Sequence, residues 1–271
     1  MDRVFEPDHS RSAGEQEFSP VTIEIGAYSG ERNIEKRRNK DCYLQRPPMA
    51  VTYVSHHRQE EYSSMFFAPM EFKDAGLSHN PLKALVAPRP IGWISSMGAD
   101  GSINLAPYSF FNALSEDPAI VVFSVQAATT GHQKDSLRNV EETGAFTVNI
   151  VGAAQLDAMN TSSGDYPYGE NEFVAAGLDM IPGQTVPTPR VGGAPAALEC
   201  ALLQTIKLPA NERGGHYTAV LGTVTGIFVD DNIVVDGKVD SASLALVARM
   251  GYRDYARIND FFQLDRPVIG T

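Results

Sequence analysis

The stretch APRPIGWISSMGADGSINLAPYSFF, residues 87–111, decides the fold expected of this chain. Its first half, residues 91–96, is typical of a β-strand, a turn rich in Gly and Asp follows, and a second strand starts at Ile103. This order predicts a β-hairpin. The returning strand also contains a proline, which cannot donate a ladder hydrogen bond, and polar side chains that need partners. These residues are Asn104, Pro107 and Ser109. A plain hairpin would leave such groups without partners.

Short apolar runs separated by Gly, Pro, Asp and Asn continue on both sides of the hairpin. The runs rich in Val, Ile, Phe or Thr predict strands at 84–87, 91–97, 103–112, 119–125, 145–151, 197–208, 216–230 and 232–235. Helices are expected at 135–143, 153–160 and 242–249. For the first helix, Asp135 or Ser136 is the expected cap and Gly144 the expected end. The pattern favours a mainly β protein, a β-barrel with accessory helices, over a parallel α/β sheet.

Residues 161–195, rich in Gly and Pro, form a long excursion between two of these strands. A segment of that length inside a compact domain is usually functional or covers a partner. We therefore expect it to serve a function, although its composition does not say which.

The first 64 residues differ from the rest, because they show no sustained helical or strand period and mix charges in a cluster such as EKRRNKD. Such composition is typical of a disordered or weakly structured extension. We therefore divide the chain into an N-terminal extension, 1–64, and one domain, 65–271. Met65 could be the biological start, or the extension could be a genuine tail that packs on the domain.

Composition excludes several functional classes. The formal net charge is -11, with 33 Asp and Glu against 22 Lys and Arg, which argues against a nucleic-acid platform or binding to an anionic membrane surface. No apolar run approaches the length of a membrane helix. The 2 cysteines, Cys42 and Cys200, lie in one polar and one apolar region. We expect no disulfide between them and a cytoplasmic location.

Several motifs of common enzyme classes are absent. The sequence has no G-x-G-x-x-G after a strand, P-loop, H-E-x-x-H, C-x-x-C or G-x-S-x-G. Its 6 histidines are scattered, so we expect no metal site. What remains are polar groups suited to a flat, phosphorylated ligand. Lys134 and Ser136 stand at a predicted helix N-terminus, which favours an anion, although Asp135 and Ser136 could simply cap that helix.

The order of four segments resembles the flavin reductase-like family of FMN-binding split barrels. The segments are APRPIGWISS, GSINLAPYSFFNALSEDPAIVVFS, KDSLRNVEETGAFTVNIV and GGHYTAVLGTV. The resemblance covers about residues 66–267, most of the chain after Met65. It implies a split β-barrel, FMN as cofactor, NADH or NADPH as hydride donor, a homodimer, and in some members a monooxygenase partner.

The resemblance also implies site residues. The strand with Trp93, Ser95 and Ser96 would border the isoalloxazine ring. The run Asn104 to Phe110 would meet the polar edge and ribityl chain of the flavin, through Asn104, Ala106, Pro107, Ser109 and Phe110. Phe111 and Asn112 would lie toward the phosphate, and Lys134, Asp135 and Ser136 match the K-D-[ST] element that holds it. Arg89 also matches a family position.

His216 is the expected catalytic residue, at the flavin face that nicotinamide approaches. The family histidine follows Gly-Asp, whereas this chain has Gly215 in place of that Asp. The resemblance implies that the protein is an FMN-binding oxidoreductase that transfers hydride from NAD(P)H to FMN. The alternative is an FMN-binding electron carrier or a non-catalytic flavin-binding protein, because a fold does not fix its function.

Overall fold

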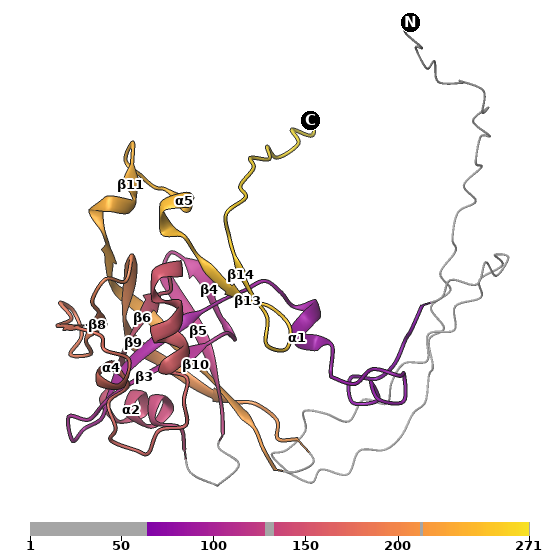
Figure 1. Cartoon of the computed structure of the whole chain (residues 1–271), viewed down its shortest axis with the longest axis horizontal. Coiled ribbons are helices and arrows are strands. Elements are labelled where there is room, and N and C mark those ends of the chain that lie inside the picture. Colours follow the sequence, from indigo (N-terminus) through magenta and orange to yellow (C-terminus); the bar gives the residue numbers. More distant parts are fainter. Residues whose placement is uncertain (1–63, 128–132, 212–213, 271) are drawn as a thin grey trace, which may run out of the picture. The chain divides into compact units, whose positions relative to one another are not determined.

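The computed structural model describes residues 64–127, 133–211 and 214–270. These residues form a mainly β fold with short helices, as the sequence predicts (Figure 1). The expected extension, apart from Ser64, lies outside the described residues, and so does Cys42. Cys200 is buried and has a free thiol.

The central element is a seven-stranded sheet in which every pair of neighbouring strands is antiparallel. The strand order is β3-β2-β6-β9-β10-β5-β4. In chain order the strands are β2 Gly92–Met97, β3 Ile103–Tyr108, β4 Phe111–Glu116, β5 Ala119–Gln126, β6 Ala145–Ile150, β9 Ala196–Lys207 and β10 Tyr217–Val229. The predicted hairpin is confirmed, since β2 and β3 pair from Gly92↔Tyr108 to Met97↔Ile103.

A short connection forces this sheet to roll up. β3 and β4 form opposite edges of the sheet, yet β3 ends at Tyr108 and β4 begins at Phe111. Three Cα steps span at most about 11 Å, whereas the edges of a flat seven-stranded sheet would be about 29 Å apart. The edges therefore meet without pairing to each other, which makes the sheet a split barrel (Figure 1).

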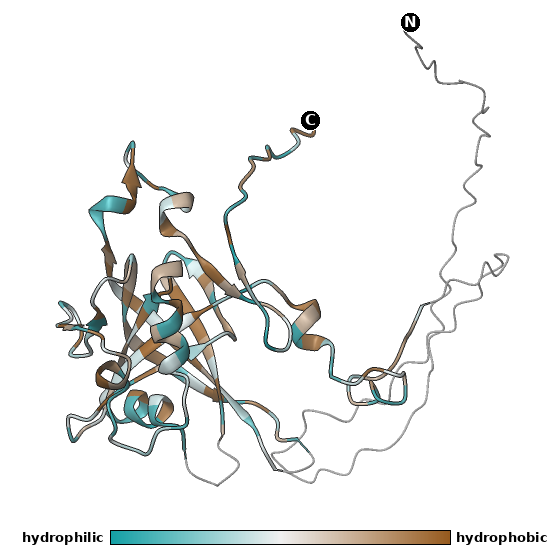
Figure 2. Cartoon of the chain, in the orientation of Figure 1, coloured by the Kyte–Doolittle hydropathy of each residue, from teal (hydrophilic) through white to brown (hydrophobic). Residues whose placement is uncertain are grey.

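Hydrophobic residues pack on both faces of the central strands. Consecutive residues of β2 separate the two cores, because Ile94 belongs to the barrel interior and Trp93 to an outer cluster. Phe123 and Phe146 pack edge to face in the interior, with ring centroids 5.2 Å apart. Trp93 is fully buried among Leu105, Met159 and Phe173 in the outer cluster. Figure 2 shows the hydrophobic residues concentrated in the strands.

Smaller sheets complete the fold. A three-stranded sheet has the order β1-β13-β14, and two pairs of strands lie elsewhere. The bounds are β1 Arg89–Pro90, β13 Val247–Arg249, β14 Tyr255–Arg257, β7 Met180–Ile181, β8 Arg190–Val191, β11 Val234–Val235 and β12 Lys238–Val239. Arg89 ties the three-stranded sheet to the segment before it, because its guanidinium donates to the carbonyls of Lys83, Val86 and Met250.

The helices are short and lie against the barrel. They are α1 Leu82–Leu85, α2 Asp135–Thr143, η1 Ala153–Gln155, α3 Leu156–Thr161, α4 Glu172–Ala175, η2 Asp231–Ile233 and α5 Ser241–Leu244. The predicted bounds of α2 and its end at Gly144 are confirmed. The expected cap is wrong, because Lys134 is the N-cap residue and the Ser136 side chain bonds elsewhere.

Four predicted elements differ from the structure. The segment 84–87 is not a strand, because the Asn80 side chain accepts from the Leu82 amide and starts α1 there. The predicted strand 103–112 divides into β3 and β4. The predicted helix 242–249 ends at Leu244, where Ala245 takes a positive φ of 46°, and continues as β13. Only the last two residues of 232–235 are in a strand.

Substitution of Gly222 by alanine tests the packing of the barrel interior. A Cβ at this position would lie 2.3 Å from Cζ of the fully buried Phe146. We expect Gly222→Ala to lower the free energy of unfolding by about 1–3 kcal/mol, because the ring has no free space to move into. Chemical denaturation measures the free energy of unfolding of the variant and of the parent protein. Gly270→Ala is the control, since no atom lies within 4 Å of its Cβ, and equal stability of the two variants would contradict this packing.

Candidate functional site

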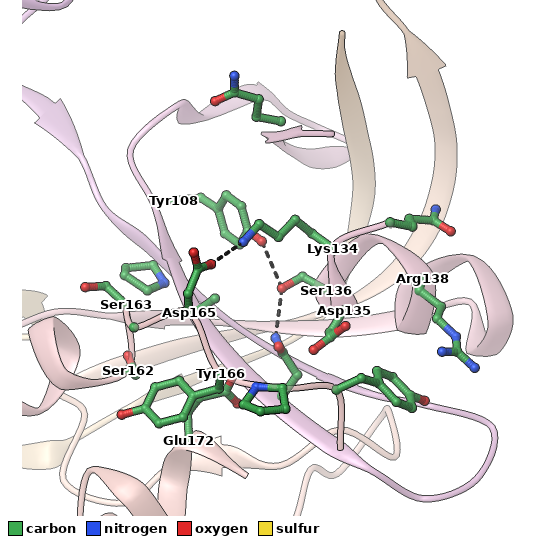
Figure 3. Close-up of a pocket in the computed structure, with 18 of the residues that line it drawn as sticks. Tyr108, Lys134, Asp135, Ser136, Arg138, Ser162, Ser163, Asp165, Tyr166 and Glu172 are labelled. Carbon is green, nitrogen blue, oxygen red and sulfur yellow. Dashed lines mark hydrogen bonds and ion pairs between the residues drawn. The ribbon is translucent and has the colours of Figure 1, made fainter. Parts of the chain in front are cut away.

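A pocket of about 1050 Å³ opens beside β3, between the start of α2 and the segment that precedes α4 (Figure 3). We call it the larger pocket. Its lining residues are Asn104, Ala106, Pro107, Tyr108, Gln126, Ala127, Gln133, Lys134, Asp135, Ser136, Arg138, Ser162, Ser163, Gly164, Asp165, Tyr166, Pro167, Tyr168 and Glu172. It thus combines an edge strand of the barrel with a helix N-terminus.

A chain of hydrogen bonds crosses the floor of the larger pocket. Burial raises the pKa of Tyr108 to about 12, so its hydroxyl keeps its proton and donates to Ser136 Oγ at 3.0 Å. With its amide oxygen toward Ser136, Asn104 accepts from Ser136 Oγ at 2.8 Å and its Nδ2 donates to Glu172 Oε1 at 3.2 Å. The chain fixes the orientation of each polar group, because every hydroxyl and amide in it has a defined donor or acceptor role.

Glu172 ends this chain as a buried carboxyl group. It is 5% exposed, and its Oε2 accepts from the Leu105 amide at 2.8 Å. Its pKa is raised, first by burial and then by the nearby charges of Asp135 and Glu170. Because Glu172 belongs to α4 and bonds to the backbone of β3, it also fixes one wall of the pocket to the barrel.

The N-terminus of α2 forms part of the wall of the larger pocket, through Asp135 and Ser136. The N-cap residue, Lys134, makes no side-chain hydrogen bond to the helix, so the first amides are not capped by it. Its Nζ forms an ion pair with Asp165 Oδ1 at 2.8 Å across the pocket (Figure 3). Lys134 is half exposed and Asp165 almost fully exposed, so this pair is weak and an anion can replace the carboxylate.

Six of the residues expected from the sequence line the larger pocket: Asn104, Ala106, Pro107, Lys134, Asp135 and Ser136. The side chains expected from β2 lie inside the protein instead. Trp93 donates from Nε1 to Ser162 Oγ at 2.8 Å, Ser95 donates to the Pro189 carbonyl at 2.5 Å, and Ser96 accepts from Asn139 Nδ2 at 3.2 Å. All three are 0% exposed, and none of them lines the larger pocket.

The remaining expected residues lie outside the larger pocket. Arg89 and Ser109 line a second, smaller pocket, and Phe110 lies under the cation of Arg89 at 5.9 Å. Phe111 packs on the barrel interior, and Asn112 is exposed and accepts from the Ala113 amide.

His216 is not among the residues that line either pocket. Its carbonyl accepts from the amide of Ala127, which does line the larger pocket. The structure therefore places the backbone of His216 beside the site without bringing its side chain to the pocket wall.

Sequence reasoning missed the wall formed by the excursion 161–195. Its first part supplies the lining residues Ser162, Ser163, Gly164, Asp165, Tyr166, Pro167, Tyr168 and Glu172. Only the unusual length of the segment pointed to a function. No spacing or motif indicated that Glu172 would reach Leu105 and Asn104, because those contacts join positions far apart in the sequence.

The described part of the chain lacks two further features, a cluster of metal ligands and a membrane-spanning helix. Residues 64–127, 133–211 and 214–270 contain no group of three or more His, Cys, Asp or Glu side chains that could hold a metal ion. Among the same residues, no helix is both long enough and apolar enough to cross a membrane.

The raised pKa of Glu172 predicts a pH dependence of stability. Folding disfavours the ionised form, so the stability that this group contributes is present below its unfolded pKa and decreases as pH rises through its folded pKa. Glu172→Gln removes the ionisation. We therefore expect the melting temperature of the variant, relative to the parent protein, to rise as pH increases from about 4 to 8. A difference between the two proteins that does not change with pH would contradict the assignment.

Comparison with known proteins places this fold in a family. The sequence profile of the flavin reductase like domain matches residues 85–249. An uncharacterized protein of Deinococcus radiodurans is 40% identical over 193 residues, which are 68% of this chain and 82% of that protein. An uncharacterized protein of Halalkalibacterium halodurans, BH2278, is 34% identical over 186 residues, which are 68% of this chain and 88% of that protein.

Solved structures agree with this fold. Nitrilotriacetate monooxygenase component B from Bacillus cereus is 28% identical with a TM-score of 0.69, covering 74% of this chain and 99% of that one. The Pseudomonas fluorescens 2-nitrobenzoate 2-nitroreductase NbaA is 28% identical with a TM-score of 0.61, covering 71% of this chain and 94% of that one. The profile match extends over more than half of the chain and includes the whole seven-stranded sheet. The chain therefore belongs to the family of proteins with a flavin reductase like domain.

Proposed function

We propose that this protein is an FMN-binding oxidoreductase that transfers hydride from NADH or NADPH to FMN held in the larger pocket. The observation that supports it most is the convergence of Lys134, Ser136 and the N-terminus of α2, which the Lys134 side chain does not cap, on a pocket of about 1050 Å³. Backbone amides, the helix dipole and a cation together favour a phosphate group. When bound, FMN supplies the hydride chemistry itself.

The residues of the larger pocket fit this cofactor in size and chemistry. Its volume of about 1050 Å³ is slightly above the range of about 300–1000 Å³ typical of small-molecule sites, so it has room for a cofactor of this size. Ala106 and Pro107 provide an apolar wall for a flat ring, and Tyr108 and Asn104 provide a hydroxyl and an amide group for a ribityl chain. Pro107 also pairs with Trp93 on one side without donating a hydrogen bond of its own.

Charge limits where the phosphate can bind. The chain has a formal net charge of -11, and the larger pocket contains the carboxyl groups of Asp135, Asp165 and Glu172. Within the larger pocket, an incoming dianion is therefore attracted most near Lys134, since the other cation that lines it, Arg138, is paired with Glu142. This attraction acts within the screening length of about 8–10 Å. Displacement of Asp165 from Lys134 would remove one negative charge from the binding position. On binding, the phosphate would thus replace the Asp165 carboxylate as the partner of Lys134.

Two solved relatives support the redox character of the proposal, since they are named as a monooxygenase component and as a nitroreductase. At 28% identity and TM-scores above 0.6, both likenesses extend over most of the barrel. A monooxygenase that consumes the reduced flavin is the partner class that the first name suggests for this chain.

The absorbance spectrum tests the proposed function directly. We expect the purified protein to take up FMN and the flavin bands to bleach on anaerobic addition of NADH or NADPH, which also shows the preferred donor. Bands that persist would contradict the oxidoreductase and leave an FMN carrier or binding protein. A failure to take up FMN would contradict the cofactor.

Substitution of Ser136 tests the position of the cofactor. Ser136→Ala removes a hydroxyl at the helix N-terminus, so we expect FMN affinity to fall roughly tenfold, as for the loss of one charge-assisted hydrogen bond. Ser136→Thr keeps the hydroxyl and should retain affinity. Quenching of flavin fluorescence measures both variants, with the exposed Ser241→Ala as control. Equal affinity of the Ser136→Ala variant and the parent protein would contradict this placement.

We also infer that the protein forms a homodimer. Leu114, Leu203 and Ile227 lie on β4, β9 and β10 and are more than half exposed, at 56%, 52% and 66%. Burial of these three side chains against a second copy would remove apolar surface from water. We expect light scattering to give twice the 29.4 kDa mass of the chain, and a monomer at micromolar concentration would contradict the inference.

A further inference from the structure

A second pocket of about 480 Å³ lies next to the larger one, and we call it the basic pocket. The two pockets share Pro107 and Ser163 as lining residues. The basic pocket is lined by Lys83, Arg89, Ile91, Pro107, Ser109, Met159, Asn160, Ser163, Arg249, Tyr252, Arg253 and Tyr255. Four of these side chains are cationic and none is a carboxylate.

This collection of cations is unusual for a chain with a formal net charge of -11. Two ion pairs join side chains of the described residues, Lys134 with Asp165 and Arg138 with Glu142, and neither involves the basic pocket. The positive charges of the basic pocket are therefore not neutralised by carboxylates in the described part of the chain. Like charges held together cost free energy, which an anionic ligand recovers.

Arg89 and Arg249 are held in place by the protein. Arg89 is 6% exposed and donates to three carbonyls, while its Nε is buried without a hydrogen-bond partner among the described residues. Arg249 donates to the carbonyl of Tyr252 and lies over the ring of Tyr255 at 4.4 Å. Burial and the charge of Arg249 both lower the pKa of Arg89. The two fixed guanidinium groups repel each other in the absence of an anion.

Lys83 and Arg253 provide the accessible charges. Both side chains belong to exposed residues, and Lys83 lies 5.7 Å from the ring centroid of Phe110. Arg253 makes no interaction that would withdraw it from a ligand within residues 64–127, 133–211 and 214–270. Two fixed and two adaptable cations, with Tyr252 and Tyr255 beside them, suit a small molecule that carries a phosphate or carboxylate group.

We propose that the basic pocket is a second ligand site, which binds the phosphate or carboxylate group of the second substrate beside the cofactor in the larger pocket. The assignment to a second substrate rests on the proposed function, whereas binding of an anion does not. The shared lining residues Pro107 and Ser163 make the two sites adjacent, so a molecule held by its anionic end in one can reach the other.

Calorimetric titration of the full-length protein with pyrophosphate and, separately, with phthalate tests the anion site without any flavin. We expect binding that weakens as salt concentration rises. The double variant Lys83→Gln, Arg253→Gln should bind the preferred probe roughly tenfold more weakly, since two charged contacts are lost. The double variant Lys238→Gln, Arg257→Gln removes the same charge from exposed positions outside the pocket and should bind within about twofold of the parent protein.

Each outcome decides the proposal. Tighter binding of pyrophosphate indicates a phosphorylated second substrate such as a nucleotide, and tighter binding of phthalate indicates a carboxylic acid. Absence of binding by both probes, or equal loss in the two double variants, overturns the site. FMN affinity that falls as much as probe affinity in the Lys83, Arg253 variant assigns these charges to the flavin phosphate and overturns a separate second site. The anion titration contains no flavin, so its result does not depend on whether the Ser136→Ala variant binds FMN. Failure of the proposed function and failure of the anion site can therefore be told apart.

Discussion

The two-residue connection between β3 and β4 is the constraint on which the rest of the structure depends. It joins the two edges of a seven-stranded sheet, so the sheet has to close around the interior core of Phe123, Phe146 and their neighbours. Closure brings the edges together but does not pair them with each other. The free edge of β3 is then available to other elements, and α2, α3 and α4 all contact it (Figure 1).

The larger pocket is a consequence of this free edge. Because no strand pairs with the outer side of β3, polar groups there are satisfied by side chains from helices, as when Glu172 accepts from the Leu105 amide. Ser136 brings the start of α2 to the same place through its bonds with Tyr108 and Asn104. A helix N-terminus, an edge strand and a buried carboxyl group therefore meet at one position, which local sequence patterns alone do not bring together.

Local patterns were sufficient for the elements with strong periodicity. The hairpin of β2 and β3 and the helix α2 follow from alternation, turn residues and Gly144, which takes a φ of 71° at the helix end. The segment 84–87 was expected to be a strand because its apolar composition fits a strand as well as a helix. The Asn80 side chain, which accepts from the Leu82 amide at the start of α1, favours the helix. The strand expected at 103–112 contains no signal for the corner at Ser109, since closure of the whole sheet imposes it.

The parts of the site whose residues are close together in the sequence could be predicted. The wall formed by the excursion could not, because its residues are far in the sequence from β3 and α2. Asn104, Pro107, Lys134 and Ser136 line the pocket as expected. The polar residues of β2 are a different case, since Ser95 bonds to the Pro189 carbonyl in the interior. A polar side chain in an apolar strand needs a partner, but sequence alone does not tell whether that partner is a ligand or another part of the chain.

The first part of the excursion is fixed to the barrel through Ser162 and Glu172, and this has a consequence for how ligand selectivity can change. Ser162 accepts from Trp93 Nε1 at 2.8 Å, and Glu172 accepts from the Leu105 amide at 2.8 Å. Between these anchors, residues 163–168 form one wall of the pocket and contribute nothing to either hydrophobic core. Substitutions there can reshape the pocket while the barrel keeps its stability, so new ligand preferences can arise without a new fold.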